Sequence, residues 1–254
     1  MSILEHIQQL TQLIREAKKI TFFTGAGIST ESGIPDWRSS NGLYTQNEKH
    51  QDLVSVSYFQ SNPKGFWKAY KEIYNIKLLN SYEPNSGHRF ITKLQEQGKD
   101  VTVITQNNDG LHTAAGTKRV YEVHGTLTDA SCPKCKTVYD LDHINNNDIP
   151  RCIRINSKDE ACNFILRPDI VLFGDQIKHY NESLDNAYAS DLFIVMGTSL
   201  EVGPINSIPQ YIGRTDIPMV LINKDKTNFD DLFDFCIYSG IGETLKEVEK
   251  GLRG

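Results

Sequence analysis

The spacing of apolar residues predicts an amphipathic helix at the start of the chain, followed directly by a strand. Residues on one face of the helix recur every three or four positions: Ile3, Ile7, Leu10, Ile14 and Ala17. The next segment, residues 20–24, reads Ile-Thr-Phe-Phe-Thr, a β-branched and aromatic run of strand length. A glycine-containing turn at residues 25–27 follows this predicted strand.

Further apolar runs of strand length predict a parallel sheet. They occupy residues 101–105, 170–173, 192–196 and 219–222. Most of these runs alternate with stretches of helical character, such as residues 86–97 and 205–212. Because short, continuously apolar strands that alternate with helices suit a parallel sheet covered on both faces, the predicted fold class is α/β.

Two stretches break the alternation and predict a second, smaller domain. Residues 44–90 are polar and aromatic and suggest short helices, whereas residues 128–167 contain four clustered cysteines and few core residues. We interpret both as insertions, one a helical insertion and the other a metal-binding module. The remaining segments are expected to form the sheet domain: residues 1–43, 91–127 and 168–254.

Charge and composition exclude several classes of protein. The 254 residues include 27 basic and 32 acidic side chains, a formal net charge of −5, so no basic excess exists to neutralise nucleic-acid phosphates. No apolar run approaches the roughly 20 residues that a membrane-spanning helix needs. Residues 1–19 lack the apolar stretch of a signal peptide, and five cysteines are too few for a disulfide-rich secreted scaffold. We therefore expect a cytoplasmic protein.

Four of the five cysteines have a spacing that is typical of zinc sites. Cys132, Cys135, Cys152 and Cys162 form the pattern C-x2-C-x16-C-x9-C. The final spacing of nine is wider than usual, and free thiols remain the alternative. A shell of four thiolates leaves no position for a reacting water, so the predicted zinc ion is structural. Cys236 lies in an apolar run and is expected to pack as a small hydrophobic residue.

Polar and glycine-rich motifs follow two of the predicted strands. Residues 25–27 could cradle a diphosphate with backbone amides, although Thr30 stands where the usual dinucleotide fingerprint has its third glycine, and an ordinary tight turn is the alternative. Residues 105–112 (TQNNDGLH) offer amide and carboxylate groups where ligands bind in open α/β sheets. Here Asn107 or Asp109 could instead cap a helix. His124 is a candidate general base, with a structural role as the alternative.

Taken in order, these motifs resemble those of the sirtuins, a family of NAD-dependent protein deacylases. The resemblance extends from residue 20 to about residue 245 and includes, besides the cysteine module, these segments: residues 25–29, 33–38, 105–112, 124–125, 167–174, 197–200 and 222–223. It implies a Rossmann-like NAD-binding sheet within a single catalytic unit that also carries a zinc-ribbon module.

The resemblance also implies individual roles. For the catalytic step it implies His124 as general base, with Asn107 and Asp109 positioning the nicotinamide ribose. The implied NAD contacts are Gly25, Ala26, Gly27, Asp36, Trp37, Arg38, Gln106, Asn107, Asp109, Gly197, Thr198, Ser199, Asn223 and Ile241. The implied acyl-lysine contacts are Val171, Phe173, Gly174 and Tyr70, with the substrate peptide adding as a strand between residues 171–174 and the loop near residues 201–203.

The implied activity is NAD-dependent deacetylation of a protein or peptide lysine, producing nicotinamide and O-acetyl-ADP-ribose. This sequence departs from the family pattern at Trp37, Asn108 and Asp175, where Phe, Ile and Glu are usual. Ile73 stands where succinyl-preferring members carry arginine, so we expect a preference for uncharged acyl groups. NAD hydrolysis or mono-ADP-ribosyl transfer is the alternative activity, and a non-enzymatic binding module is a third. No nucleic-acid or membrane partner is expected, and the oligomeric state stays open.

Overall fold

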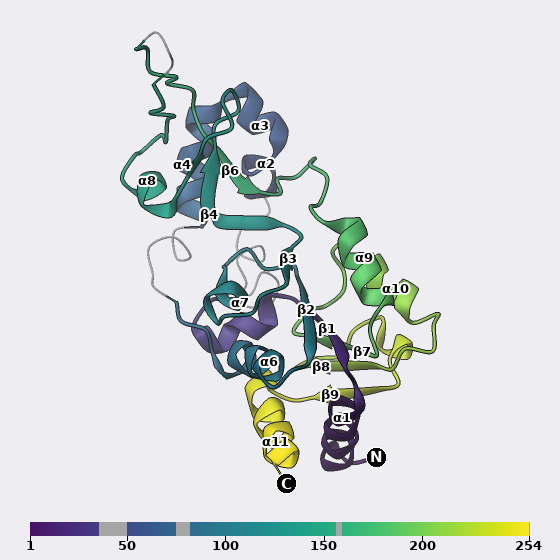
Figure 1. Ribbon diagram of the computed structural model, residues 1–254. Helices are drawn as coiled ribbons and strands as arrows, with labels where there is room; N and C mark the ends of the chain where they lie inside the picture. Colours follow the sequence, from purple (N-terminus) through teal and green to yellow (C-terminus); the bar gives the residue numbers. More distant parts are fainter. Residues whose placement is uncertain (36–49, 75–81, 156–158, 254) are drawn as a thin grey trace.

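The computed structural model describes residues 1–35, 50–74, 82–155 and 159–253 (Figure 1). Its helices are α1 (Ile3–Glu16), η1 (Ala26–Ser32), α2 (His50–Leu53), α3 (Val56–Ser61), α4 (Pro63–Ile73), α6 (Ser86–Glu96), α7 (Leu111–Ala114), α8 (Leu141–Asn145), α9 (Tyr180–Tyr188), α10 (Ser207–Ile212), η2 (Asp230–Leu232) and α11 (Ile241–Arg253). Its strands are β1 (Lys19–Thr24), β2 (Asp100–Thr105), β3 (Val120–Glu122), β4 (Gly125–Ser131), β5 (Val138–Tyr139), β6 (Arg167–Ile170), β7 (Leu192–Met196), β8 (Met219–Asn223) and β9 (Phe235–Tyr238). Within the described ranges, each helix is too short or too polar to cross a membrane.

Six strands form a parallel sheet with the order β3-β2-β1-β7-β8-β9. Thr24, the last residue of β1, pairs with Thr105 of β2 on one side and with Met196 of β7 on the other. The carboxyl ends of these three central strands therefore meet at one edge of the sheet. In open α/β sheets, ligands bind at this edge.

Alternating side chains of the central strands pack into two separate cores, one on each face of the sheet. Phe22 contributes to a core shared with α1, α6 and α11, whereas its neighbour Phe23 contributes to the core under α9 and α10. Phe193 and Ile194 of β7 divide between the two faces in the same way. The helices thus cover both faces (Figure 1), and the predicted α/β class is confirmed.

A second, smaller part of the molecule lies beyond the carboxyl edge of the sheet (Figure 1). There β5, β4 and β6 form a three-stranded antiparallel sheet that shares a core with α4. The indole Nε1 of Trp67 on α4 donates to the Leu166 carbonyl at 2.7 Å. Lys71 donates to the carbonyls of Ile144 and Asn147 at 2.5 and 2.7 Å, which ties α4 to the end of α8.

The sequence-based prediction for residues 170–173 was wrong. This apolar run was expected to add a strand to the parallel sheet, but Ile170 ends β6 and pairs with Gly125 of β4 in the small antiparallel sheet. The following residues continue in an extended path, where Phe173 forms an isolated bridge to Ser55. Hydrophobicity alone cannot tell which of two sheets a short strand joins, because either one buries its side chains.

Candidate functional site

Three glycines bring the turn after β1 against the end of β7. The Gly27 amide donates to the Gly197 carbonyl at 2.8 Å, and the Gly25 amide donates to the Met196 carbonyl at 3.1 Å. A Cβ added at Gly27 would lie 2.7 Å from the Gly197 Cα, and Gly197 itself has a φ of +62°. Only glycine permits an approach this close and this backbone conformation. The turn at residues 25–27 therefore packs against the end of β7 more closely than an ordinary tight turn requires.

A buried polar network connects this turn to the end of β2. The Asn107 side chain donates to the Gly25 carbonyl and to the Ser29 hydroxyl, both at 3.1 Å. The Ser29 hydroxyl in turn donates to Asp109 at 2.7 Å, and Asp109 also accepts from the Leu111 amide at the start of α7. The N-cap of α7 is Gly110, so neither Asn107 nor Asp109 is the capping residue, although the Asp109 carboxylate does accept from the first amide of the helix.

Gln106 contributes a buried donor that has no partner within the described structure. Its Oε1 accepts from the Thr198 hydroxyl at 3.1 Å, whereas its Nε2 is buried and unpaired. An unsatisfied buried donor is costly, of order 1–3 kcal/mol. Its position at the carboxyl edge of the sheet indicates that a bound ligand completes its hydrogen bonding.

His124 follows β3 and is held in one orientation by the backbone. Its Nδ1 lies 2.9 Å from the Gln106 carbonyl, and because a carbonyl only accepts, Nδ1 carries the proton. This leaves Nε2 with a free lone pair. Burial lowers the pKa of His124, and the hydrogen bond to Gln106 only partly offsets this effect. The imidazole is therefore neutral near pH 7 and able to accept a proton.

The residue after His124 fixes the junction between the two sheets. Gly125 has a φ of +74°, and a Cβ placed there would lie 2.0 Å from the Asp169 carbonyl oxygen of β6. The His124 carbonyl also accepts from the Val171 amide at 2.7 Å. Consequently the His124 imidazole and the segment after β6 are held in fixed positions relative to each other.

A cleft of about 1170 Å³ opens between the sheet edge and the smaller part. The expected site residues among those lining it are Ala26, Gly27, Gln106, Asn107, His124, Val171, Phe173, Gly174, Gly197, Thr198, Ser199, Asn223 and Ile241. Gly25 and Asp109 do not line the cleft themselves. Gly25 packs against Gly197 and Thr198, and Asp109 is linked through Ser29 to Asn107. Asp36, Trp37 and Arg38 lie outside the described residues.

Tyr70 is the expected contact that the structure places elsewhere. Its ring is fully buried, stacked on Phe66 and against Trp67, in the core of the smaller part and away from the residues that line the cleft. Burial raises the pKa of its hydroxyl well above the usual range. Tyr74, one helical turn later, lines the cleft instead. The sequence identified the helix correctly but not which of its tyrosines faces the cleft.

Hydrogen bonds hold the backbone of the segment from Val171 to Gly174 on both of its edges. Phe173 donates its amide to the Val54 carbonyl at 3.2 Å and accepts from the Val56 amide at 3.0 Å. Asp175, which pairs with Arg167, also accepts from the Leu172 amide at 2.9 Å. The Phe173 side chain remains 45% exposed. Asp175 has a shorter side chain than the glutamate that is usual in the family, but it still reaches Arg167 and the Leu172 amide and so holds this segment in place.

Several cleft residues were not anticipated from the sequence. Lys224, Asp225 and Lys226 follow β8, and Ser239 and Gly240 follow β9. The same rule that identified residues 105–112, ligand binding at the carboxyl ends of strands, would have identified the first three. The sequence around Cys236 shows an apolar run but does not mark it as a strand, so the same rule could not identify Ser239 and Gly240.

A carboxylate next to the network has an unusual environment. Burial, together with the charges of Asp109 and Asp129, raises the pKa of Glu122 to about 7, against a lowering contribution from Lys178. The nearby negative charges disfavour ionisation of the Glu122 carboxyl. Glu122 is therefore partly protonated near pH 7.

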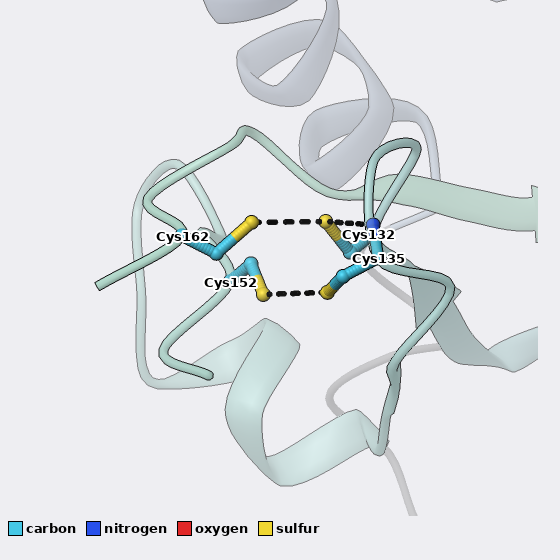
Figure 2. Close-up of side chains that lie close together, drawn as sticks. All are labelled: Cys132, Cys135, Cys152 and Cys162. Carbon is cyan, nitrogen blue, oxygen red and sulfur yellow. Dashed lines mark hydrogen bonds between the residues drawn. The ribbon is translucent and has the colours of Figure 1, made fainter. Parts of the chain in front are cut away.

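The four clustered cysteines converge in the smaller part of the molecule (Figure 2). Their sulfur atoms all lie within 4.8 Å of one another. A tetrahedral Zn²⁺ site with Zn–S bonds of about 2.3 Å has sulfur separations of about 3.8 Å, so this arrangement fits such an ion. Cys132 and Cys152 are buried, and Cys135 and Cys162 are partly exposed. Cys236 lies apart from them on β9 and is partly buried.

Comparison with known proteins agrees with this architecture. A family model described as the Sir2 family matches residues 25–204. The chain is 47% identical to the NAD-dependent protein deacetylase 2 of Geobacillus kaustophilus, over 98% of this chain and 99% of that protein. It is 46% identical to the NAD-dependent protein deacetylase of Chromobacterium violaceum, over 95% and 96% of the two chains.

Solved structures give the same result. A Sir2 structure with p53 peptide and NAD+ has a TM-score of 0.80 to this chain at 32% identity, and all of both chains is covered. A Sir2 variant with deacetylated p53 peptide and 3′-O-acetyl ADP ribose has a TM-score of 0.84, also at 32% identity, over 96% of this chain and 97% of that one. Sequence and structure thus agree along nearly the whole length, and the chain belongs to the Sir2 family, the sirtuins.

Proposed function

We propose that this protein is an NAD-dependent protein-lysine deacetylase that converts acetyl-lysine and NAD to lysine, nicotinamide and O-acetyl-ADP-ribose. The observation that carries the proposal is the position of His124: a neutral imidazole, held by the Gln106 carbonyl through Nδ1, lines the same cleft as a close-packed glycine turn. The curated relatives named above are NAD-dependent protein deacetylases at 46–47% identity.

The cleft suits NAD on the sheet side. Its volume of about 1170 Å³ exceeds the range of about 300–1,000 Å³ that is typical of single small-molecule sites, and so allows a dinucleotide together with a substrate segment. The glycine turn would approach the diphosphate, and Gln106 Nε2 supplies an unpaired buried donor for the ribose. Towards the adenosine we assign Asn223, Ile241 and Ser199. Asp36, Trp37 and Arg38 remain predicted NAD contacts.

The residues around the nicotinamide ribose would position and deprotonate it. NAD supplies an activated ribose carbon that the amide oxygen of the acetyl-lysine can attack as nicotinamide departs. Asn107 and Asp109, locked together through Ser29, would hold that ribose in place. His124 Nε2 would then accept the proton of a ribose hydroxyl, because Nδ1 is already committed to the Gln106 carbonyl.

The substrate side of the cleft suits an extended peptide. The peptide would lie between this segment, whose Phe173 backbone already pairs with Val54 and Val56, and the loop near residues 201–203, of which Val202 and Gly203 line the cleft. Phe173, Val171 and Gly174 would contact the acyl-lysine. Ile73 is 8% exposed within the core of the smaller part, so this position offers no guanidinium to a succinyl carboxylate and we propose acetyl as the preferred group.

We also propose one structural Zn²⁺ ion held by the four clustered cysteines. Thiolates are the ligands that zinc prefers in closed structural sites, and the sulfur separations fit a tetrahedron. We further propose that the two insertions form the smaller part, with bounds adjusted from those expected at residues 44–90 and 128–167: α6 packs in the core of the large sheet, so the first insertion ends before Ser86, and β4 and β6 extend the second to Gly125–Ile170. A cytoplasmic location stays an expectation from the sparse cysteines, since a thiolate site needs reduced thiols.

The test is a product analysis with purified protein, NAD and matched acetyl- and succinyl-lysine peptides. We expect O-acetyl-ADP-ribose by mass spectrometry and at least tenfold slower turnover of the succinyl peptide. ADP-ribose formed without peptide dependence would instead support the hydrolase alternative. The observation that favours that alternative is Asn108, which is polar, lines the cleft and is only 8% exposed.

His124→Ala tests the assigned base. Removing a general base typically slows a reaction by about 10²–10⁴-fold, and we expect deacetylation to fall by at least 10²-fold. NAD binding, measured by calorimetry, should change little because the glycine turn and Gln106 remain. A variant that keeps wild-type turnover would remove His124 from the mechanism.

A further inference from the structure

The carboxylate of Glu31 caps a helix that begins far away in the sequence. Glu31 lies in the last turn of η1, and its Oε1 accepts from the Gly242 amide, in the first turn of α11, at 2.9 Å. Amides in the first turn of a helix have no partner within that helix, so a nearby side chain usually accepts from one of them. The Ser239 hydroxyl, just before α11, instead donates to Glu243 at 3.4 Å. The start of α11 is therefore held by a segment that lies 211 residues earlier.

The Glu31 carboxylate lies where η1, α6 and α11 pack closely together. A Cβ added at Gly242 would lie 2.1 Å from Glu31 Oε2 and 2.8 Å from the hydroxyl of Ser86, the first residue of α6. A Cβ added at Gly87 would lie 3.4 Å from the Ile241 side chain. The first turns of both helices thus meet beside the carboxylate. Because each helix carries partial positive charge at its N-terminus, a negative side chain is stabilised in this position.

Side chains of η1 connect it to two different parts of the cleft. The Ser29 hydroxyl donates to Asp109 and accepts from Asn107, which ties η1 to the end of β2. Glu31 ties it to α11. With seven residues, η1 is long for a 3-10 helix, whose hydrogen bonds have poorer geometry than those of an α-helix. Contacts with neighbouring elements therefore contribute to its position, and the one through Glu31 is independent of the network around Ser29.

We propose that Glu31 is a positioning residue for NAD, which holds the start of α11, and with it Ile241, against the glycine turn at the adenosine end of the cleft. Glu31, Gly240 and Ile241 all line the cleft. The inference rests on the proposed function, in which Ile241 contacts the adenosine. The groups assigned to the nicotinamide ribose are held by other contacts, as given above for Asn107 and His124. Loss of Glu31 therefore weakens NAD binding and leaves the chemical step in place.

Steady-state kinetics of three variants measures this effect. Glu31→Ala removes a hydrogen bond to a charged acceptor and should raise the KM for NAD about tenfold. Its kcat and its KM for the acetyl-lysine peptide should stay within about twofold of wild type, the pattern of lost cofactor binding. Glu31→Gln keeps an acceptor oxygen for the Gly242 amide and should restore the KM for NAD to within about threefold. Glu243→Gln is the matched control, since it removes a carboxylate from the same turn of α11 that pairs with Ser239 instead.

A double-mutant cycle tests the contact itself without turnover. Gly242→Ala places a methyl group at the position of Glu31 Oε2 and should displace the carboxylate. The dissociation constant of ADP-ribose, measured by calorimetry, should rise about as much in Gly242→Ala as in Glu31→Ala. In the double variant the new methyl group no longer meets the carboxylate, so the two losses should not add. Gly242→Ala also supplies a second route to the same answer if Glu31→Ala does not fold.

Three results would overturn the role of Glu31: a wild-type KM for NAD in Glu31→Ala, a fall in kcat at unchanged KM, or additive losses in the cycle. An equal weakening of NAD and peptide binding would reduce Glu31 to a general structural contact and would also overturn it. Failure of the proposed function gives a different result. If the wild type binds ADP-ribose but does not deacetylate the peptide, the deacetylase activity is contradicted, while the dissociation constants of the variants still decide the role of Glu31.

Discussion

The two sheets of this protein are stabilised by different kinds of interaction. Strand β7 of the six-stranded sheet is buried along its whole length, and its side chains divide between two apolar cores. The three-stranded sheet has a smaller core and is held in addition by polar links, such as Trp67 to Leu166 and Lys71 to α8, and by the four thiols. Apolar burial therefore stabilises the large sheet, whereas specific hydrogen bonds and a cluster of four thiols add to the apolar core of the small one.

The two sheets also supply different sides of the cleft. The large sheet supplies strand ends that carry Gln106 and Asn107, while the small sheet supplies the segment that follows β6. The regions meet at His124, whose carbonyl accepts from Val171 and whose neighbour Gly125 touches Asp169. The cleft is thus lined on one side by strand ends of the large sheet and on the other by the segment that follows the small sheet, and the following experiments perturb the two sides separately.

Zinc removal should have the largest effect and should be confined to one region. Because the smaller part has a limited apolar core, chelation should raise backbone hydrogen exchange by orders of magnitude at residues 128–155 and 159–167. The amides of β1 and β7 should stay protected, since their cores contain none of the four thiols. Hydrogen-exchange mass spectrometry with and without chelator gives the comparison. Equal loss of protection in both sheets would show that the regions do not unfold separately.

Gly125→Ala should be strongly destabilising at the junction, with Gly98→Ala as its matched control. Both glycines have positive φ angles, +74° and +92°, but a Cβ at Gly98 has nothing within 4 Å. Gly98→Ala should therefore cost only the left-handed backbone strain of about 1–2 kcal/mol. Gly125→Ala adds a clash with the Asp169 carbonyl and should cost several times more. Urea denaturation measures both, and equal losses would mean that the junction relaxes freely.

Acid should weaken the large domain through two buried histidines whose rings lie 4.7 Å apart. Burial lowers the pKa of His88 to about 4 and that of His112 well below its usual value. Since the unfolded chain binds these protons more readily, stability is complete above about pH 6.5 and falls as the pH drops towards 4. At pH 5 the loss from a site like His88 is about 2 kcal/mol.

Denaturation of wild type and His88→Gln at pH 7 and pH 5 measures this effect. The variant should lose less stability between the two values, while His179→Gln, at a half-exposed histidine, should follow the wild type. An identical pH dependence in all three proteins would assign the acid sensitivity to other groups.

Tyr139→Phe should have the smallest effect and should be limited to the metal site. The Tyr139 hydroxyl donates to Cys152 Sγ at 3.1 Å and accepts from the Ile153 and Arg154 amides at 2.9 and 3.1 Å. Loss of a hydrogen bond to a metal ligand typically weakens metal binding by about 10–100-fold, and we expect the lower end of that range. Competition with a chelator measures it, with Tyr188→Phe on exposed α9 as the control. Unchanged affinity would make the hydroxyl a purely structural link.

The sequence predicted the elements of the large sheet well and those of the small sheet poorly. Residues 192–196 and 219–222 became β7 and β8 because uninterrupted apolar runs of that length are buried wherever they pack. Residues 170–173 did not join that sheet, and the edge strands β3 and β9 were not anticipated. Short edge strands depend on their neighbours for hydrogen bonds, and a pattern of single residues does not name the neighbour.

By itself, the sequence determined the α/β class, the cysteine spacing and the order of polar motifs after strands, because periodicity and local spacing are encoded residue by residue. Only the tertiary structure decided which of these motifs meet. It placed Tyr74 rather than Tyr70 at the cleft, left Gln106 Nε2 without a partner among the described residues, and brought Cys132 next to Cys162 across 30 residues of chain. Contacts between residues far apart in the chain depend on how the elements pack together, and a local sequence pattern does not predict that packing.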